Sequence, residues 1–167
     1  MKKLLQLITV ASLTLSLAAC GGGGSSSSSS GDPSASCSAG SSASSGSSSV
    51  TALSISDSII GSGPAVVAGN TLVVNYTGWL YQSGATNNEG AQFGTTAGGQ
   101  PFQFQIGTNP SQVIAGWDQG LLGMQAGGVR TLTIPSALAY GSCAPVGSNI
   151  PPGSALVFTV SLVSVAP

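Results

Sequence analysis

Four short runs between residues 71 and 162 carry a large apolar side chain at every second position. This spacing is typical of β-strands that bury one face and leave the other wet or lightly covered, as antiparallel sheets allow. A weaker run of the same kind lies at residues 50–60. The apolar positions of the four runs are Leu72, Val74 and Tyr76; Phe102, Phe104 and Ile106; Leu132 and Ile134; and Leu156, Phe158, Val160 and Leu162.

One segment of the same region, residues 113–121, has helical spacing instead. Ile114, Trp117 and Leu121 stand at i, i+3 and i+7, so they share one face of a short helix. Gly and Pro cluster between the runs, as at residues 61–64 and 151–153, and mark turns. The pattern predicts an α+β domain in which an antiparallel sheet of about five strands wraps around one short helix.

The chain begins with the features of a secretory signal peptide. Lys2 and Lys3 precede a largely apolar stretch at residues 4–17, which is too short to span a membrane. The ending Leu17-Ala18-Ala19-Cys20 resembles a lipobox, so we expect cleavage before Cys20 and lipidation of its thiol. The alternative is an ordinary signal peptide with an incidental cysteine. Acyl chains on Cys20 would hold the mature chain at a membrane surface.

Residues 21–49 come next, and 16 of these 29 residues are Ser and 7 are Gly. Such a stretch has almost nothing to bury, so we expect a disordered spacer with an end-to-end distance of roughly 30 Å. The predicted organisation is a lipoprotein signal peptide at 1–19, the lipidated Cys20 with its tether at 20–49, and one folded domain at 50–167. In bacterial lipoproteins an Asp after the lipidated cysteine often signals inner-membrane retention. Gly21 therefore favours a place in the cell envelope at the periplasmic face of the outer membrane or at the cell surface.

Two further cysteines, Cys37 in the tether and Cys143 in a loop, admit two interpretations. Outside the cytoplasm two thiols tend to pair, and a disulfide between them would pin part of the tether to the domain. The other interpretation is two free thiols. A catalytic Cys143 is not expected, because the mature chain has no His or Lys to activate it.

The composition excludes several classes of chemistry. The chain has no His, and only 4% of its residues are charged. Catalytic triads, His-based acid–base chemistry and nearly all zinc sites therefore lack their residues. One arginine, Arg130, remains after signal-peptide removal, so a nucleic-acid-binding surface cannot be built. We expect no metal, no cofactor and no nucleic-acid partner.

Seven short motifs between residues 53 and 165, in their order and spacing, resemble the FKBP family of peptidyl-prolyl cis-trans isomerases. The motifs are Val74-Asn75-Tyr76-Thr77-Gly78-Trp79-Leu80, Gln92-Phe93, Pro101-Phe102-Gln103-Phe104-Gln105-Ile106-Gly107, Val113-Ile114-Ala115-Gly116-Trp117-Asp118-Gln119-Gly120, Gly123-Met124-Gln125-Ala126-Gly127, Leu138-Ala139-Tyr140-Gly141 and Ile150-Pro151-Pro152-Gly153-Ser154-Ala155-Leu156-Val157-Phe158. The family fold, an antiparallel sheet curved around a short helix, agrees with the fold that the spacing predicts.

The resemblance implies an apolar pocket that accepts a proline ring, with Trp117 as its floor. The Ile114 N–H and the Tyr140 hydroxyl would donate hydrogen bonds to a bound proline-containing polypeptide or to a macrolide inhibitor. For Phe104, Leu132 and Leu156 we expect an ordinary place in the core. The residues implied as catalytic are Tyr76, Phe93, Ile114, Trp117, Tyr140 and Phe158, and those implied as substrate-binding are Phe102, Val113 and Ile150.

The sequence departs from the family pattern in two places. Gly94 follows Phe93 where the family has an Asp that contacts the substrate region and supports activity, and Cys143 and Asn149 stand where a His and an apolar residue are often seen. These departures imply lower activity or an altered preference. Two functions follow from the resemblance: an isomerase that assists the folding of secreted or envelope proteins, or a module that binds proline-containing or unfolded chains with little or no turnover.

Overall fold

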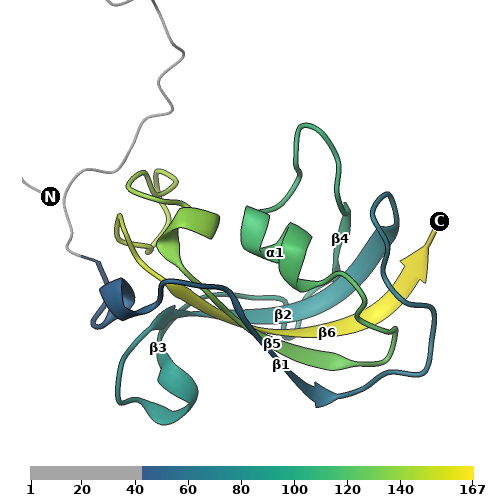
Figure 1. Cartoon of the computed structure of the whole chain (residues 1–167), viewed down its shortest axis with the longest axis horizontal. Coiled ribbons are helices and arrows are strands. Elements are labelled where there is room, and N and C mark those ends of the chain that lie inside the picture. Colours follow the sequence, from purple (N-terminus) through teal and green to yellow (C-terminus); the bar gives the residue numbers. More distant parts are fainter. Residues whose placement is uncertain (1–42) are drawn as a thin grey trace, which may run out of the picture. The chain divides into compact units, whose positions relative to one another are not determined.

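The computed structural model describes residues 43–167, and the strands of this part form one antiparallel sheet (Figure 1). Along the sheet the order is β1-β5-β6-β2-β3, while β4 pairs with β2 off this path. The strands are β1 (Ser54–Ile59), β2 (Thr71–Tyr81), β3 (Glu89–Thr95), β4 (Phe102–Gln105), β5 (Val129–Ile134) and β6 (Leu156–Ala166). The helical elements are α1 (Ala115–Gly120) and the 3-10 turns η1 (Ser47–Ser49), η2 (Thr86–Asn88) and η3 (Ser136–Leu138).

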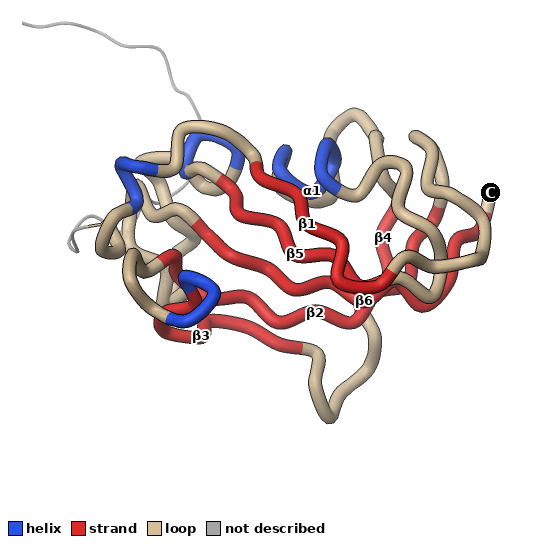
Figure 2. The backbone as a smooth tube through the Cα atoms, turned by 60° about the horizontal axis from the view of Figure 1, so that its bottom comes forward, coloured by secondary structure: helices blue, strands red, loops and turns tan. Residues whose placement is uncertain are grey.

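The predicted fold class is confirmed, and the alternation in the sequence explains why. On β5 the buried positions are Arg130, Leu132 and Ile134, and the residues between them are half-buried. Phe104, Leu132 and Leu156 lie in the core as expected, none more than 3% exposed. The two longest strands, β2 and β6, pair over ten residues of β2 and form the centre of the sheet, as Figure 2 shows.

The sheet contains a sixth strand, β3, that the spacing did not predict. Its burial does not alternate, because it lies at the sheet edge and is paired only with β2. Its register on β2 also shifts twice, around Trp79. Backbone hydrogen bonding to β2, which a side-chain pattern does not reveal, holds this segment in the sheet.

Helix α1 covers one face of the sheet (Figures 1 and 2). Its backbone lies directly against side chains of β5. A Cβ added at Gly120 would lie 2.8 Å from Cδ2 of Leu132, and one added at Gly116 would overlap Cγ2 of Ile134. The two glycines are four residues apart, so they share the helix face that meets β5. Their missing side chains set how close the helix lies.

The guanidinium of Arg130 joins β5, the edge strand β1 and the end of α1. Its Nε and Nη2 donate to the two carboxylate oxygens of Asp57 on β1, at 2.6 and 2.9 Å. Its Nη1 donates to the carbonyls of Gly120 and Leu122, at 2.8 and 3.1 Å. These carbonyls are at the carboxyl end of α1, where a cation is electrostatically favourable.

The folded part begins earlier than predicted. Residues 44–49, which the composition assigns to the disordered tether, contact the domain and include η1. The reason is specific hydrogen bonding by serine side chains, because this segment has almost no apolar surface to bury. The signal peptide at 1–19, Cys20, and the tether up to residue 42 lie outside the described residues. Within residues 43–167, no helix is both long and apolar enough to cross a membrane.

We predict that Gly116→Ala lowers the free energy of unfolding. The added methyl group overlaps the buried side chain of Ile134, and overpacking of this kind costs roughly 1–3 kcal/mol. Alanine gains about 1 kcal/mol over glycine in a helix, so the net loss is smaller than the overlap alone. Urea unfolding measures it, with Gly99→Ala as the control because a Cβ there meets only Thr96 O at 3.6 Å. Equal stability of Gly116→Ala and the unmodified chain would contradict the close contact.

Candidate active site

A cavity of about 160 Å³ opens between α1 and the sheet. Its walls come from four strands, from α1, and from two loops that precede α1 and follow η3. Every predicted catalytic or substrate-binding residue except Ile150 lies in this wall. The lining residues are Tyr76, Phe93, Phe102, Gln112, Val113, Ile114, Trp117, Tyr140 and Phe158.

Trp117 lies at the centre of an aromatic cluster that forms the base of the cavity. Its ring meets those of Tyr76 and Phe158 edge to face, each with centroids 5.3 Å apart. Edge-to-face aromatic pairs stabilise the folded state by more than the burial of their apolar area alone. The indole is only 4% exposed, yet the cavity lies open above it. Its Nε1 has no hydrogen-bond partner, the one buried side-chain polar atom of the described part in that state.

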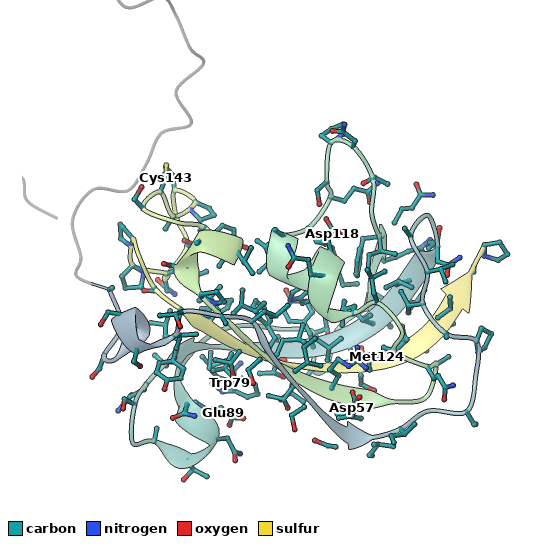
Figure 3. The ribbon with its side chains drawn as sticks, in the orientation of Figure 1. Asp57, Trp79, Glu89, Asp118, Met124 and Cys143 are labelled. Carbon is teal, nitrogen blue, oxygen red and sulfur yellow. The ribbon has the colours of Figure 1, made fainter. Side chains whose placement is uncertain are left out.

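The loop before α1 carries Gln112, Val113 and Ile114 into the cavity wall. The carboxylate of Asp118 ties this loop to the helix, because it accepts hydrogen bonds from the Gly107 N–H at 2.9 Å and from the Ser111 hydroxyl. Figure 3 shows Asp118 on the side of α1 away from the sheet. The loop is therefore fixed to the same helix that presents Trp117.

Ile114 is the N-cap residue directly before α1, with an extended backbone at φ −64° and ψ 149°. Its carbonyl accepts from the N–H groups of Trp117 and Asp118. Its own N–H donates to no protein acceptor in the described part of the chain, as is usual for the first N–H groups of a helix. A donor is thus available at the wall of the cavity.

Tyr140 faces the cavity from the loop after η3 and is half-buried. Burial raises the pKa of its hydroxyl above the ordinary value of 10.0, and the neighbouring Tyr76 raises it further. The hydroxyl therefore keeps its proton throughout the neutral and mildly alkaline range. It can serve as a hydrogen-bond donor there.

Two residues at the site differ from the sequence prediction. Ile150 is 6% exposed and packs in the core cluster, and it is not among the residues that line the cavity. Gln112, which lines the cavity, was not predicted. Its side-chain oxygen accepts from the Gln105 N–H at 3.0 Å. A lone glutamine in a loop carries no pattern, so spacing could not have identified it.

Gly94 leaves space beside the cavity. A Cβ built on it would have as its nearest neighbours Cε2 and the hydroxyl of Tyr76, each at an ordinary 3.7 Å. Unlike ten other described glycines, Gly94 has no positive φ. The site could therefore hold a larger side chain without strain.

The remaining predicted features concern cysteines and metals. Cys143 is disulfide-bonded, which fits the first of the two interpretations. Cys37, like Cys20, lies outside the described residues, so the pairing of Cys37 with Cys143 stays a prediction. Within residues 43–167, no group of three or more His, Cys, Asp or Glu side chains could hold a metal ion.

Comparison with known proteins identifies the family. Residues 63–163 match the family described as FKBP-type peptidyl-prolyl cis-trans isomerase. An FK506-binding protein of Streptomyces anulatus is 43% identical over 113 residues, which are 68% of this chain and 86% of that protein. Among solved structures, FkpA from Escherichia coli aligns with a TM-score of 0.58 and 37% identity over 70% of this chain and 49% of that one. AtFKBP13 aligns with a TM-score of 0.56 and 35% identity over 68% and 93%.

This chain belongs to the FKBP-type peptidyl-prolyl cis-trans isomerases. The family binds proline-containing substrates and, in general, macrolide inhibitors. The predicted isomerase activity is confirmed, and a binding module without turnover is not favoured. The roles of individual residues in the cavity stay predictions.

We predict that Gly94→Asp raises kcat/KM on a prolyl peptide. It restores the acid that the family has after the phenylalanine, and the carboxylate would lie beside the Tyr76 hydroxyl. A charge-assisted hydrogen bond made to the bound peptide in the transition state would contribute roughly 1.5–3 kcal/mol, so the expected rise is about tenfold or more. Gly94→Asn is the control, since it fills the same space without the charge. A rate unchanged or lowered in the aspartate variant alone would contradict a role for the charge.

Proposed function

We propose that this chain is a lipid-anchored prolyl isomerase of the cell envelope. The prolyl ring of a secreted or envelope protein binds in the cavity above Trp117, and the preceding amide bond rotates there. The observation that carries the site assignment is the open aromatic cavity with the indole at its base.

The reaction needs no nucleophile, metal or proton carrier. Rotation about the amide of a prolyl residue must overcome its partial double-bond character, against a barrier of about 18–20 kcal/mol. The twisted amide has a less polar carbonyl than the planar amide. A cavity walled by Phe93, Phe102, Trp117 and Phe158 therefore favours the twisted form over the planar one.

Two donors in the cavity wall would hold the peptide during rotation. The Ile114 N–H has no protein acceptor in the described part, and the Tyr140 hydroxyl keeps its proton because burial raises its pKa. Hydrogen bonds from these groups would fix the peptide backbone while the ring rests on the indole. Orientation of this kind removes part of the barrier before rotation begins.

We predict that Trp117→Leu and Tyr140→Phe both lower kcat/KM in a protease-coupled isomerisation assay. The expected loss is about tenfold or more for Trp117→Leu, equivalent to at least ~1.4 kcal/mol. For Tyr140→Phe it is roughly threefold to tenfold, because one neutral hydrogen bond is lost.

Two matched controls come from the other side of the sheet. Figure 3 shows Trp79 on the face opposite α1, and Tyr81 lies two residues further along β2. Trp79→Leu and Tyr81→Phe repeat the chemical changes away from the cavity, so their rates should stay near that of the unmodified chain. Melting temperatures exclude unfolding as the cause. Full rates in both cavity variants would reject this site, and retained peptide binding with no rate above blank would favour the binding module.

The envelope location rests on the lipobox-like ending at Cys20 and on Gly21 after it. We predict that Cys20→Ser moves the protein from the membrane fraction to the soluble fraction of a bacterial host. The reason is that the acyl chains that hold it at the bilayer cannot be attached. Cys37→Ser should leave the fractionation unchanged. Recovery of both variants in the same fraction as the unmodified chain would reject the lipid anchor.

A further inference from the structure

We propose that Ser47, at the end of the Ser-rich segment, is a positioning residue of the isomerase. It fixes the junction Ser154–Ala155, from which the backbone leads in one direction to Tyr140 and in the other to Phe158. The inference rests on the proposed role of Tyr140 and extends it to a segment whose composition indicates only a spacer.

Ser47 is bonded into the domain through its side chain. The residue is 5% exposed. Its hydroxyl oxygen accepts from the Ala155 N–H at 3.0 Å and lies 2.6 Å from the Ser44 hydroxyl. Ala155 is fully buried, so this hydroxyl satisfies a donor that water cannot reach. An alanine at position 47 would leave that N–H without its acceptor.

The residues around Ser47 hold the segment in one register. The Ser44 N–H donates to the Ser154 hydroxyl at 3.2 Å, and the Ser45 carbonyl accepts from the Ser83 N–H at 3.2 Å. Gly46 has φ +79°, and a Cβ there would lie 2.6 Å from Cβ of Ser83. A glycine between serines is therefore required here, although the surrounding run looks arbitrary in sequence.

The junction that Ser47 holds connects to both walls of the cavity. On one side the Gly153 N–H donates to the Gly141 carbonyl at 2.7 Å, next to Tyr140. On the other side β6 begins at Leu156, and Phe158 is its third residue. Figure 1 shows η1 at the end of the sheet where the loop between η3 and β6 lies. Displacement of the junction would move Tyr140 relative to Phe158.

The test uses the full chain, three single variants and one double variant. Ser47→Ala is expected to lower kcat/KM roughly fivefold, through misplacement of Tyr140. Ser45→Ala is the matched control, because Ser45 is exposed and its hydrogen bond to Ser83 uses only its backbone carbonyl. All rates are measured well below the melting temperature of each variant, so that loss of folded protein does not contribute.

A double-mutant cycle with Tyr140→Phe separates positioning from stability. If Ser47 acts through the Tyr140 hydroxyl, Ser47→Ala lowers the rate much less when that hydroxyl is already absent. A fall of the same size in both backgrounds, or no fall in either, would overturn the proposal. If the proposed role of Tyr140 is wrong, Tyr140→Phe alone leaves the rate unchanged. That result comes from the single variant and is therefore distinguished from a failure of the Ser47 proposal.

Discussion

The close contact between α1 and β5 is the constraint on which the cavity depends. A helix of six residues is far too short to be stable by itself, so tertiary contacts must hold it. Gly116 and Gly120 bring its backbone against the side chains of β5, and the Arg130 guanidinium binds the carbonyls at its end. With both its face and its end fixed, the helix presents Trp117 at one height above the sheet.

The position of the indole explains how the cavity can catalyse amide rotation without a nucleophile, a metal or a proton carrier. Amide rotation transfers no proton and forms no covalent bond, so the catalyst needs shape, low polarity and a few fixed donors. Aromatic rings surround Trp117, and no Asp, Glu, Lys or Arg of the described part of the chain is among the residues that line the cavity. Arg130 and Asp57 form an ion pair with each other, and the Asp118 carboxylate accepts hydrogen bonds from the loop that precedes α1. A chain with few charges and no histidine is therefore suited to this reaction.

Much of this arrangement could be predicted from the sequence, and the exceptions have physical reasons. A strand such as β5 can be predicted from the sequence, because one of its faces is buried and apolar residues therefore alternate along it. The edge strand β3 cannot, since backbone pairing to β2 alone places it. Gln112 reaches the cavity through loop geometry, which spacing cannot express. The role of Ser47 could not be predicted from composition, because composition describes the Ser-rich segment only as a whole. One hydroxyl that accepts a hydrogen bond from a buried N–H is enough to order the segment.

Within residues 43–167, the pKa values of two groups are shifted, one downward and one upward, and both shifts lead away from neutral pH. Hydrogen bonds from Arg130 lower the pKa of Asp57 below 3.8, against the opposing effect of its burial. The stability from this pair is thus present above that value and is lost as the pH falls through the lowered pKa. Burial raises the pKa of Tyr140, so its protonated form contributes fully below 10.0 and is lost as the pH rises through the raised value. The ion pair that holds α1 and the hydroxyl that faces the cavity therefore keep their states across the neutral range. Within that range the geometry around Trp117 does not depend on the titration of either group.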